Sequence, residues 1–320
     1  MSSTIIYHIT TASRRLNLFW ALSRTPHGLI DMTTPALAAL LVLGHFPPFP
    51  VIVLGLITVF AGYTAVYAIN DVVDYRNDKE KVRVGGYDDS ENYLDGVLIR
   101  HPMAKGVLNF WYGLAWGVGW TLVAMGGAYL LNPICMYLFI AGCVLEIIYC
   151  LLFSVSPLRV LVNGVVKACG PLAAVYAVTP SPPLFFLISL FMWIFFWEIG
   201  GQNIPADWTD IEEDRYFKAQ TIPVKLGLKQ AGLLCVVTLL VATFLNLILF
   251  WASPLTFGPF YLLVALAINI YLLLWPSLEL AETRRREKAM ALFNRASYYP
   301  MAVFGLVLLR ILEQVVRTPG

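Results

Sequence analysis

Residues 50–78 read PVIVLGLITVFAGYTAVYAINDVVDYRND, an apolar run that ends in a cluster of carboxylates. The apolar part is long enough to cross the hydrocarbon core of a bilayer as one helix, which takes about 20 residues. Its three aspartates, Asp71, Asp74 and Asp78, follow one another at i, i+3 and i+7. On a helix this spacing aligns three carboxylates along one face. The segment therefore predicts a membrane helix with an acidic face at one end.

The composition of the whole chain indicates the same environment. Of its 320 residues, 59% are hydrophobic and 13% are charged, whereas a soluble domain carries about 25% charged residues. The mean hydropathy is +0.71. The net charge is only +2 and there is no arm rich in Lys and Arg, so nucleic acid is not expected as a partner. The expected surroundings are the lipid bilayer.

Nine apolar runs are long enough to span a membrane, so we expect an all-α integral membrane bundle. We expect residues 1–320 to form a single transmembrane domain. The nine spans are approximately 17–44, 50–77, 104–130, 133–153, 160–179, 183–204, 230–252, 257–277 and 297–316.

Lys and Arg are concentrated in alternate loops. They occur in the N-terminal segment, which carries Arg14 and Arg15, and in the loops that follow the second, fourth, sixth and eighth spans. The intervening loops near Asn132, Ser181 and Ser253 contain neither residue type. By the positive-inside rule, the N-terminus and the charged loops are expected to be cytoplasmic. This predicts a multi-pass protein, of the plasma (inner) membrane if the source is bacterial.

The acidic pattern occurs a second time, at the end of the sixth span. Asp207, Asp210 and Asp214 repeat the spacing of the first three aspartates, and each lies 136 residues after its counterpart. Four predicted helices separate the two triads. This suggests two four-helix halves, about 17–153 and 160–277, followed by a ninth helix, as in other membrane folds with internal symmetry.

Two acidic triads on one membrane face indicate a metal site. Like charges on a helix face repel, so the pattern needs a functional reason. Carboxylate oxygens select hard cations such as Mg²⁺, which takes one or two carboxylates together with phosphate oxygens. Two facing triads could hold a diphosphate between metal ions. The alternative, two solvated helix ends, does not explain the identical spacing.

These residues resemble the UbiA-type intramembrane prenyltransferase family. The first motif matches its pattern NDxxDxxxD, and the second, DxxDxxxD, is followed by TIPVKLG as in that family. Arg24-Thr25-Pro26 is similar to its Arg-x-Pro signature, and SVSPLR at 154–159 resembles its loop between the fourth and fifth helices. The resemblance spans about residues 20–230.

The resemblance implies a bundle with a central cavity that opens sideways to lipid. It also implies a prenyltransferase, a transferase of alkyl groups other than methyl. With Mg²⁺ as cofactor, it would pass an isoprenoid from a prenyl diphosphate donor, through an allylic carbocation, to a small lipophilic acceptor that is usually aromatic.

The resemblance also implies roles for individual residues. All six aspartates would be catalytic metal ligands. Independently of the resemblance, Glu198 is a candidate to support the metal site, because it is an ionisable group inside a span about one turn before Asn203. Glu146, an acid inside the fourth span, and Arg159 are candidates for the acceptor site. The residues expected to contact the diphosphate are Asn70, Asn203, Arg24, Arg83, Arg100 and Lys218.

The chain departs from the family pattern in three places. Tyr75 stands where many members have Arg, Leu161 stands where a Lys is common, and an acidic stretch at 84–99 separates two basic positions that are often closer. Two other functions stay open. A terpene cyclase on the same scaffold would ionise the same donor, and a divalent-cation transporter, which is less favoured, would also need membrane-embedded acids.

Overall fold

The computed structural model describes residues 16–84 and 98–317, and this part of the chain contains helices and loops but no strand. Within it, nine helical segments are long and apolar enough to cross a membrane. The predicted all-α membrane bundle is therefore confirmed. Arg14, Arg15 and the acidic side chains between residues 85 and 97 lie outside the described residues.

Residues 16–22 are helical, and five helices with printed bounds follow them in the described residues up to the middle of the chain. These are α2 (Thr25–Asp31), α3 (Thr33–Leu43), α4 (Phe49–Arg83), α5 (Phe110–Leu131) and α6 (Pro133–Leu151).

The remaining elements include two π-helical segments, which are labelled η. They are α7 (Arg159–Val178), α8 (Leu184–Trp197), η1 (Glu198–Asn203), α9 (Ile204–Thr209), α10 (Ile211–Tyr216), α11 (Ile222–Ala252), α12 (Pro259–Asn269), η2 (Ile270–Leu274), α13 (Trp275–Thr283) and α14 (Arg286–Arg317).

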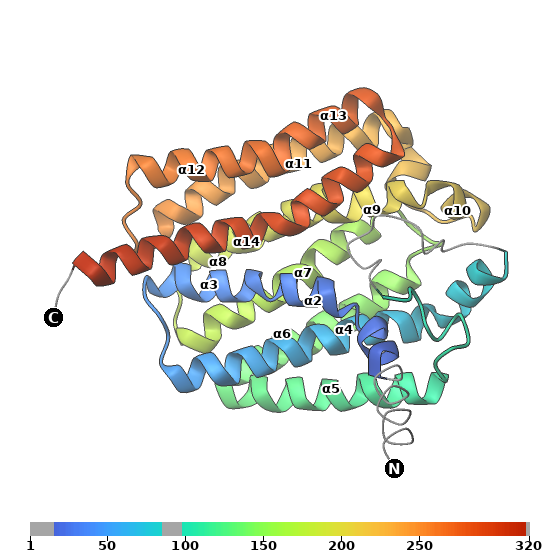
Figure 1. Ribbon diagram of the computed structural model, residues 1–320, viewed down its shortest axis with the longest axis horizontal. Coiled ribbons are helices and arrows are strands. Elements are labelled where there is room, and N and C mark those ends of the chain that lie inside the picture. The colour runs from blue at the N-terminus through green and yellow to red at the C-terminus, as the bar shows by residue number, and fades with distance from the viewer. Residues whose placement is uncertain (1–15, 85–97, 318–320) are drawn as a thin grey trace, which may run out of the picture.

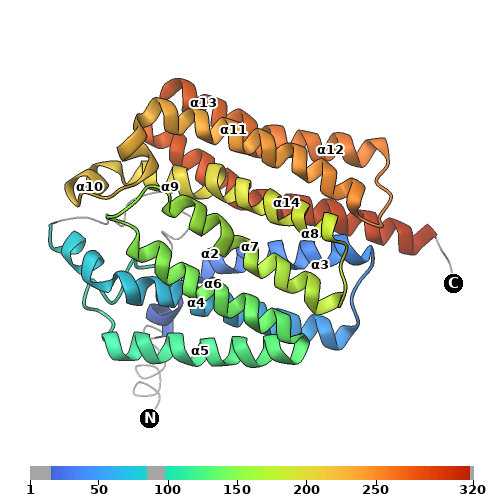
Figure 2. The same ribbon diagram turned by 180° about the vertical axis from the view of Figure 1, so that it is seen from behind.

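The long helices lie side by side along one direction (Figure 1). Helix α7 is central, because it packs against α3, α6 and α8, and the view from behind shows it between α6 and α8 (Figure 2). The C-terminal end of α4, together with α9 and α10, lies at one end of the bundle. Both acidic motifs are therefore at the same end, as the sequence predicts.

Three predicted spans differ in detail from the observed helices. The first is interrupted at Arg24, whose φ of 44° is left-handed, and again at Met32 between α2 and α3. The second continues to Arg83 without a break. The sixth contains the π-helical segment η1 and ends in two short helices. The breaks in the first and sixth spans fall near the acidic end, where regular helix gives way to the site.

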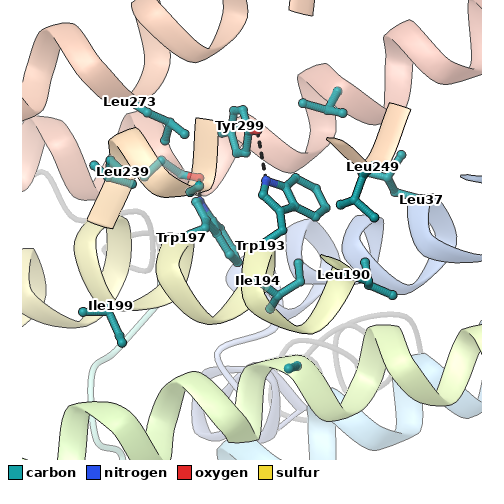
Figure 3. Close-up of a cluster of buried hydrophobic side chains, with 14 of the residues drawn as sticks. Leu37, Leu190, Trp193, Ile194, Trp197, Ile199, Leu239, Leu249, Leu273 and Tyr299 are labelled. Atoms are coloured by element: carbon teal, nitrogen blue, oxygen red, sulfur yellow. Dashed lines mark hydrogen bonds between the residues drawn. The ribbon is translucent and has the colours of Figure 1, made fainter. Parts of the chain in front are cut away.

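The main core joins α8, α11 and α14 and contains fully buried rings (Figure 3). Trp193 Nε1 donates a hydrogen bond to the Tyr299 hydroxyl at 3.2 Å, and that hydroxyl donates to Asn269 Oδ1 at 2.9 Å. Trp197 Nε1 donates to the Ala296 carbonyl at 3.1 Å. Polar groups at membrane depth have no water to bind, so these bonds satisfy the indole and phenol groups internally.

Close helix packing in this core depends on small residues, as is usual in membranes. A Cβ atom added at Gly200 would lie 2.1 Å from Thr238 Oγ1 and 3.0 Å from the Cys235 carbonyl oxygen. Segment η1 therefore approaches α11 more closely at Gly200 than a residue with a side chain would allow. The division of the chain into two four-helix halves stays a prediction, as does its orientation across the membrane.

Candidate active site

The two acidic triads line a single pocket of about 170 Å³. Helix α4 supplies Asp71, Asp74 and Asp78 from one continuous helix. The second triad is different, because α9 ends at Thr209 and Asp210 occupies the break before α10. The expectation of a single helical face is therefore wrong for the second triad. All six carboxylates nevertheless reach the same pocket.

Each aspartate of the second triad has a basic partner from another part of the chain. Arg159 Nη2 lies 3.3 Å from Asp207 Oδ1. Lys81 Nζ lies 3.9 Å from Asp214 Oδ1, and Arg100 Nη2 lies 3.9 Å from Asp210 Oδ2. The C-terminal end of α4, the loop before α5 and the first residue of α7 thus converge on the carboxylates of the second triad.

The first triad is contacted by Arg24 and His101. Arg24 Nη2 lies 3.6 Å from Asp71 Oδ1. His101 Nδ1 lies 2.9 Å from Asp78 Oδ2 and 3.3 Å from Asp71 Oδ1. Burial alone would lower the pKa of His101, but the carboxylates of Asp78 and Asp71 outweigh it and raise the pKa to about 9. The two carboxylates thus favour the protonated form of the His101 ring.

The residues of this pocket fit a hard divalent cation. Carboxylate oxygens of Asp71 and Asp78 lie within 4.8 Å of each other. Asp207 Oδ2 is buried, and among the described residues it has no hydrogen-bond partner. Burial and the neighbouring Asp207 raise the pKa of Asp214, as expected where carboxylates are crowded. Carboxylate oxygens in this number suit Mg²⁺.

The two predicted asparagines lie on the membrane side of the carboxylates. Asn70 Nδ2 donates to Glu146 Oε1 at 2.6 Å. Asn203 Nδ2 donates to the Tyr149 hydroxyl at 2.9 Å, which also accepts a hydrogen bond from Arg159 Nη2 at 2.5 Å. The amide groups thus hold the side chains that surround the pocket.

Two predicted phosphate contacts do not reach the pocket. Arg83 is exposed and pairs with Glu80 at 2.6 Å, and Lys218 is exposed in the turn after α10. Lys81 and His101 line the pocket instead, although sequence reasoning did not select them. Lys81 could have been found, because it lies three residues after Asp78 and continues the same helix face. No local pattern singles out His101.

A larger cavity of about 550 Å³ adjoins the carboxylate pocket. Its walls come from α2, α3, α4, α5, α6, α7, η1, α9 and α14 and are mainly apolar. Four residues line both spaces: Arg24, Asn70, Tyr149 and Ala206. Lining residues such as Leu56 are also exposed on the outside of the bundle. The carboxylate pocket and the apolar cavity therefore meet at these four residues, which we call the junction.

Comparison with known proteins places these features in a family. The profile of the UbiA prenyltransferase family matches residues 32–298. Among curated proteins, none matches this sequence.

Solved structures of similar fold cover nearly the whole chain. A UbiA homolog from Aeropyrum pernix K1 is 16% identical, with a TM-score of 0.68 over 88% of this chain and 97% of that one. A UbiA homolog from Archaeoglobus fulgidus bound to DMAPP and Mg²⁺ is 14% identical, with a TM-score of 0.63 over 90% and 99%. A structure from work on digeranylgeranylglyceryl phosphate synthase in membranes is 15% identical, with a TM-score of 0.65 over 95% and 100%.

Proposed function

This chain belongs to the UbiA prenyltransferase family, and we propose that it transfers an isoprenoid from a prenyl diphosphate to a lipophilic, aromatic acceptor within the membrane. The observation that carries the proposal is the junction between the carboxylate pocket and the apolar cavity. A prenyl diphosphate has the same two parts, a polyanionic head and an apolar tail, joined at the carbon that reacts.

The six aspartates are proposed to hold Mg²⁺. A UbiA homolog from Archaeoglobus fulgidus binds Mg²⁺ together with DMAPP and with GPP, and the oxygen donors of this pocket suit the same ion. Bound Mg²⁺ would neutralise the diphosphate and so make it a better leaving group. Without it, the acidic pocket would repel the head of the donor.

Basic side chains are positioned to contact the remaining phosphate oxygens. Arg24, Lys81, Arg100 and Arg159 all line the pocket. The Arg159 guanidinium lies 4.3 Å from the centroid of the Tyr149 ring and 4.9 Å from that of Phe153, which fixes the plane of its donors. Hydrogen bonds from these cations to a departing diphosphate would be charge-assisted.

The reacting carbon of the donor would lie near the junction, beside aromatic rings and one buried acid. When the C–O bond breaks, its electron pair leaves with the diphosphate and the allylic group becomes a cation. Tyr149 and Tyr67 line this space, and aromatic rings can stabilise a cation. The acceptor carbon then bonds to the cation, and Glu146 is proposed to take the proton that the acceptor loses.

The test uses purified protein in lipid nanodiscs, with GPP or geranylgeranyl diphosphate, Mg²⁺ and a panel of aromatic acceptors, read by mass spectrometry. We expect a prenylated acceptor from the wild-type chain. Asp71→Asn and Asp207→Asn should each lower the rate roughly a hundredfold or more, because the loss of a metal ligand costs several kcal/mol. A hydrocarbon product formed without acceptor would instead favour the cyclase.

Glu212→Gln provides a matched control. Glu212 is exposed on α10, pairs with Arg215 at 3.1 Å and does not line the pocket. Its loss should leave the rate nearly unchanged. Diphosphate release that persists in the double variant Asp71→Asn with Asp207→Asn would contradict the proposed role of the triads.

A further inference from the structure

A second cluster of charged side chains lies in the wall of the apolar cavity, away from the carboxylate pocket. Lys167 Nζ lies 2.6 Å from Asp31 Oδ2 and 3.9 Å from Glu198 Oε2. The Tyr67 hydroxyl donates to Asp31 Oδ2 at 2.5 Å, and Asn163 Nδ2 donates to Glu198 Oε1 at 2.8 Å. Helices α2 and α7 and the π-helical segment η1 each contribute one charged residue.

This cluster lies deeper in the membrane than the carboxylate pocket. On α7, Lys167 follows Arg159 by eight residues, which is about 12 Å along a helix. Glu198 precedes Asp207 by nine residues along the α8–η1–α9 rod. An isoprenoid tail needs no charged groups at this depth. Ionisable side chains inside a span are costly, so their presence in a cavity wall indicates a ligand with a polar group.

One atom of the cluster lacks a partner. Glu198 Oε2 is buried, and among the described residues no group forms a hydrogen bond with it. Its separation of 3.9 Å from Lys167 Nζ is too long for a direct hydrogen bond. Both residues line the cavity. An unpaired oxygen buried in this way costs free energy unless a ligand or water satisfies it.

The charges of the cluster define the group that would fit. A hydroxyl oxygen can accept a hydrogen bond from Lys167 and donate its own proton to Glu198. A carboxylate would be repelled by Asp31 and Glu198, and an ammonium group would be repelled by Lys167. A neutral hydroxyl therefore matches both sides of the gap.

We infer that Lys167 and Glu198 bind a hydroxyl group of the acceptor substrate, with Asp31 as the residue that positions Lys167. The inference deepens the proposed prenyl transfer and rests on it. It predicts that the enzyme selects neutral aromatic acceptors with a hydroxyl remote from the prenylated carbon. Acceptors that carry a carboxylate there, or no polar group, are disfavoured.

The test measures binding of three naphthalene probes to the protein in nanodiscs by calorimetry, under argon and without donor. The probes are naphthalene-1,4-diol, 1,4-dimethylnaphthalene and naphthalene-1,4-dicarboxylate. Wild-type protein should bind the diol about tenfold or more tightly than the other two, as expected for a hydrogen bond to a charged group. Glu198→Gln and Lys167→Met should reduce this preference to about twofold, with little change for 1,4-dimethylnaphthalene.

Thr58→Val is the matched control, because Thr58 lines the same cavity but bonds its hydroxyl to the Leu54 carbonyl of its own helix at 2.7 Å. It should keep the preference for the diol. Thermal unfolding is measured for each variant. If Glu198→Gln lowers the Tm but keeps the preference, the cluster is only a structural ion pair that encloses water, and the inference is wrong.

The binding preference can fail while prenyl transfer is still observed in the acceptor screen, so the two failures are distinguishable. If no donor supports prenyl transfer, the proposed function is wrong, whatever the binding measurements show. Transfer to the diol that is about tenfold slower in Glu198→Gln than in Thr58→Val would support both.

Discussion

Lys81 and Arg83 show how two residues on the same helix end can have opposite surroundings. Lys81 is buried, lines the carboxylate pocket and lies 4.8 Å from the Phe153 ring centroid. Arg83, two residues later, has a side chain that is 76% exposed. Because α4 stays helical to its end, residues at i, i+3, i+7 and i+10 share a face. Asp71, Asp74, Asp78 and Lys81 follow this series, whereas Arg83 does not.

A pair of variants tests this difference. Lys81→Met should lower prenyl transfer about a hundredfold, because it leaves the buried carboxylate of Asp214 without its cation and removes a donor to the diphosphate; a loss of about 3 kcal/mol is typical. Arg83→Met should change the rate less than about threefold, since exposed ion pairs contribute little. Steady-state rates with GPP measure both. Equal losses would contradict the assignment.

The residues of the site could be predicted from the sequence only where they belong to a periodic motif or to a recognisable segment. The aspartates were selected by their spacing, and Arg24, Arg100 and Arg159 by their place in recognisable segments; all line the pocket. His101 reaches Asp78 through a loop with a left-handed φ of 50° at the histidine itself. That contact depends on the conformation of the loop, and the periodic spacing of residues in the sequence does not predict loop conformation.

At the scale of elements, the π-helical segment η1 is the feature that hydropathy could not foresee. A span predicted over 183–204 shows only that the residues are apolar enough to be a helix. Segment η1 adds a wider turn at Glu198–Asn203, and such turns occur often at functional sites. Here it brings Glu198, Gln202 and Asn203 to the cavity wall. The Gly200-Gly201 pair permits the turn to pack against its neighbours.

Gly200→Ala tests how closely η1 packs against α11. The added methyl group would overlap Thr238 Oγ1 and approach the Cys235 backbone, so we expect a loss of about 1–3 kcal/mol in the free energy of unfolding. Gly119→Ala on α5 is the control, because no atom lies within 4 Å of the new methyl group. It should be neutral or slightly stabilising. Thermal unfolding in nanodiscs compares the two, and equal Tm values would argue against a close contact.

At the scale of the whole molecule, the number of spans and the gathering of both triads at one end follow from hydropathy and charge. Each span is encoded locally, and so is the acidic motif at its end. The cavity is not encoded locally. Its wall combines residues from nine elements that are distributed along the sequence, many of them small, such as Ala174 and Gly170. Its size and its polar cluster became visible only with all the helices in place.

The length of the cavity predicts a dependence on donor size. Ala174 lines it 15 residues after Arg159 on α7, about 22 Å along the helix. Ala174→Phe should therefore lower the use of geranylgeranyl diphosphate about tenfold through overpacking, and leave DMAPP within about twofold. Competition between the two donors in one reaction measures the ratio. An unchanged ratio would show that the tail takes another path.

Five of the six aspartates lie within 4.0 Å of an Arg, Lys or His side chain, and this has a thermodynamic consequence. Where a cation from solution takes the carboxylate oxygen that faces such a side chain, the side chain loses its counter-ion. The released side chain then lacks an anion, which a diphosphate can provide. Each ligand thus reduces the cost of binding the other, and linkage requires the two effects to be equal. The enzyme would bind its metal and its donor cooperatively, and neither of them well alone.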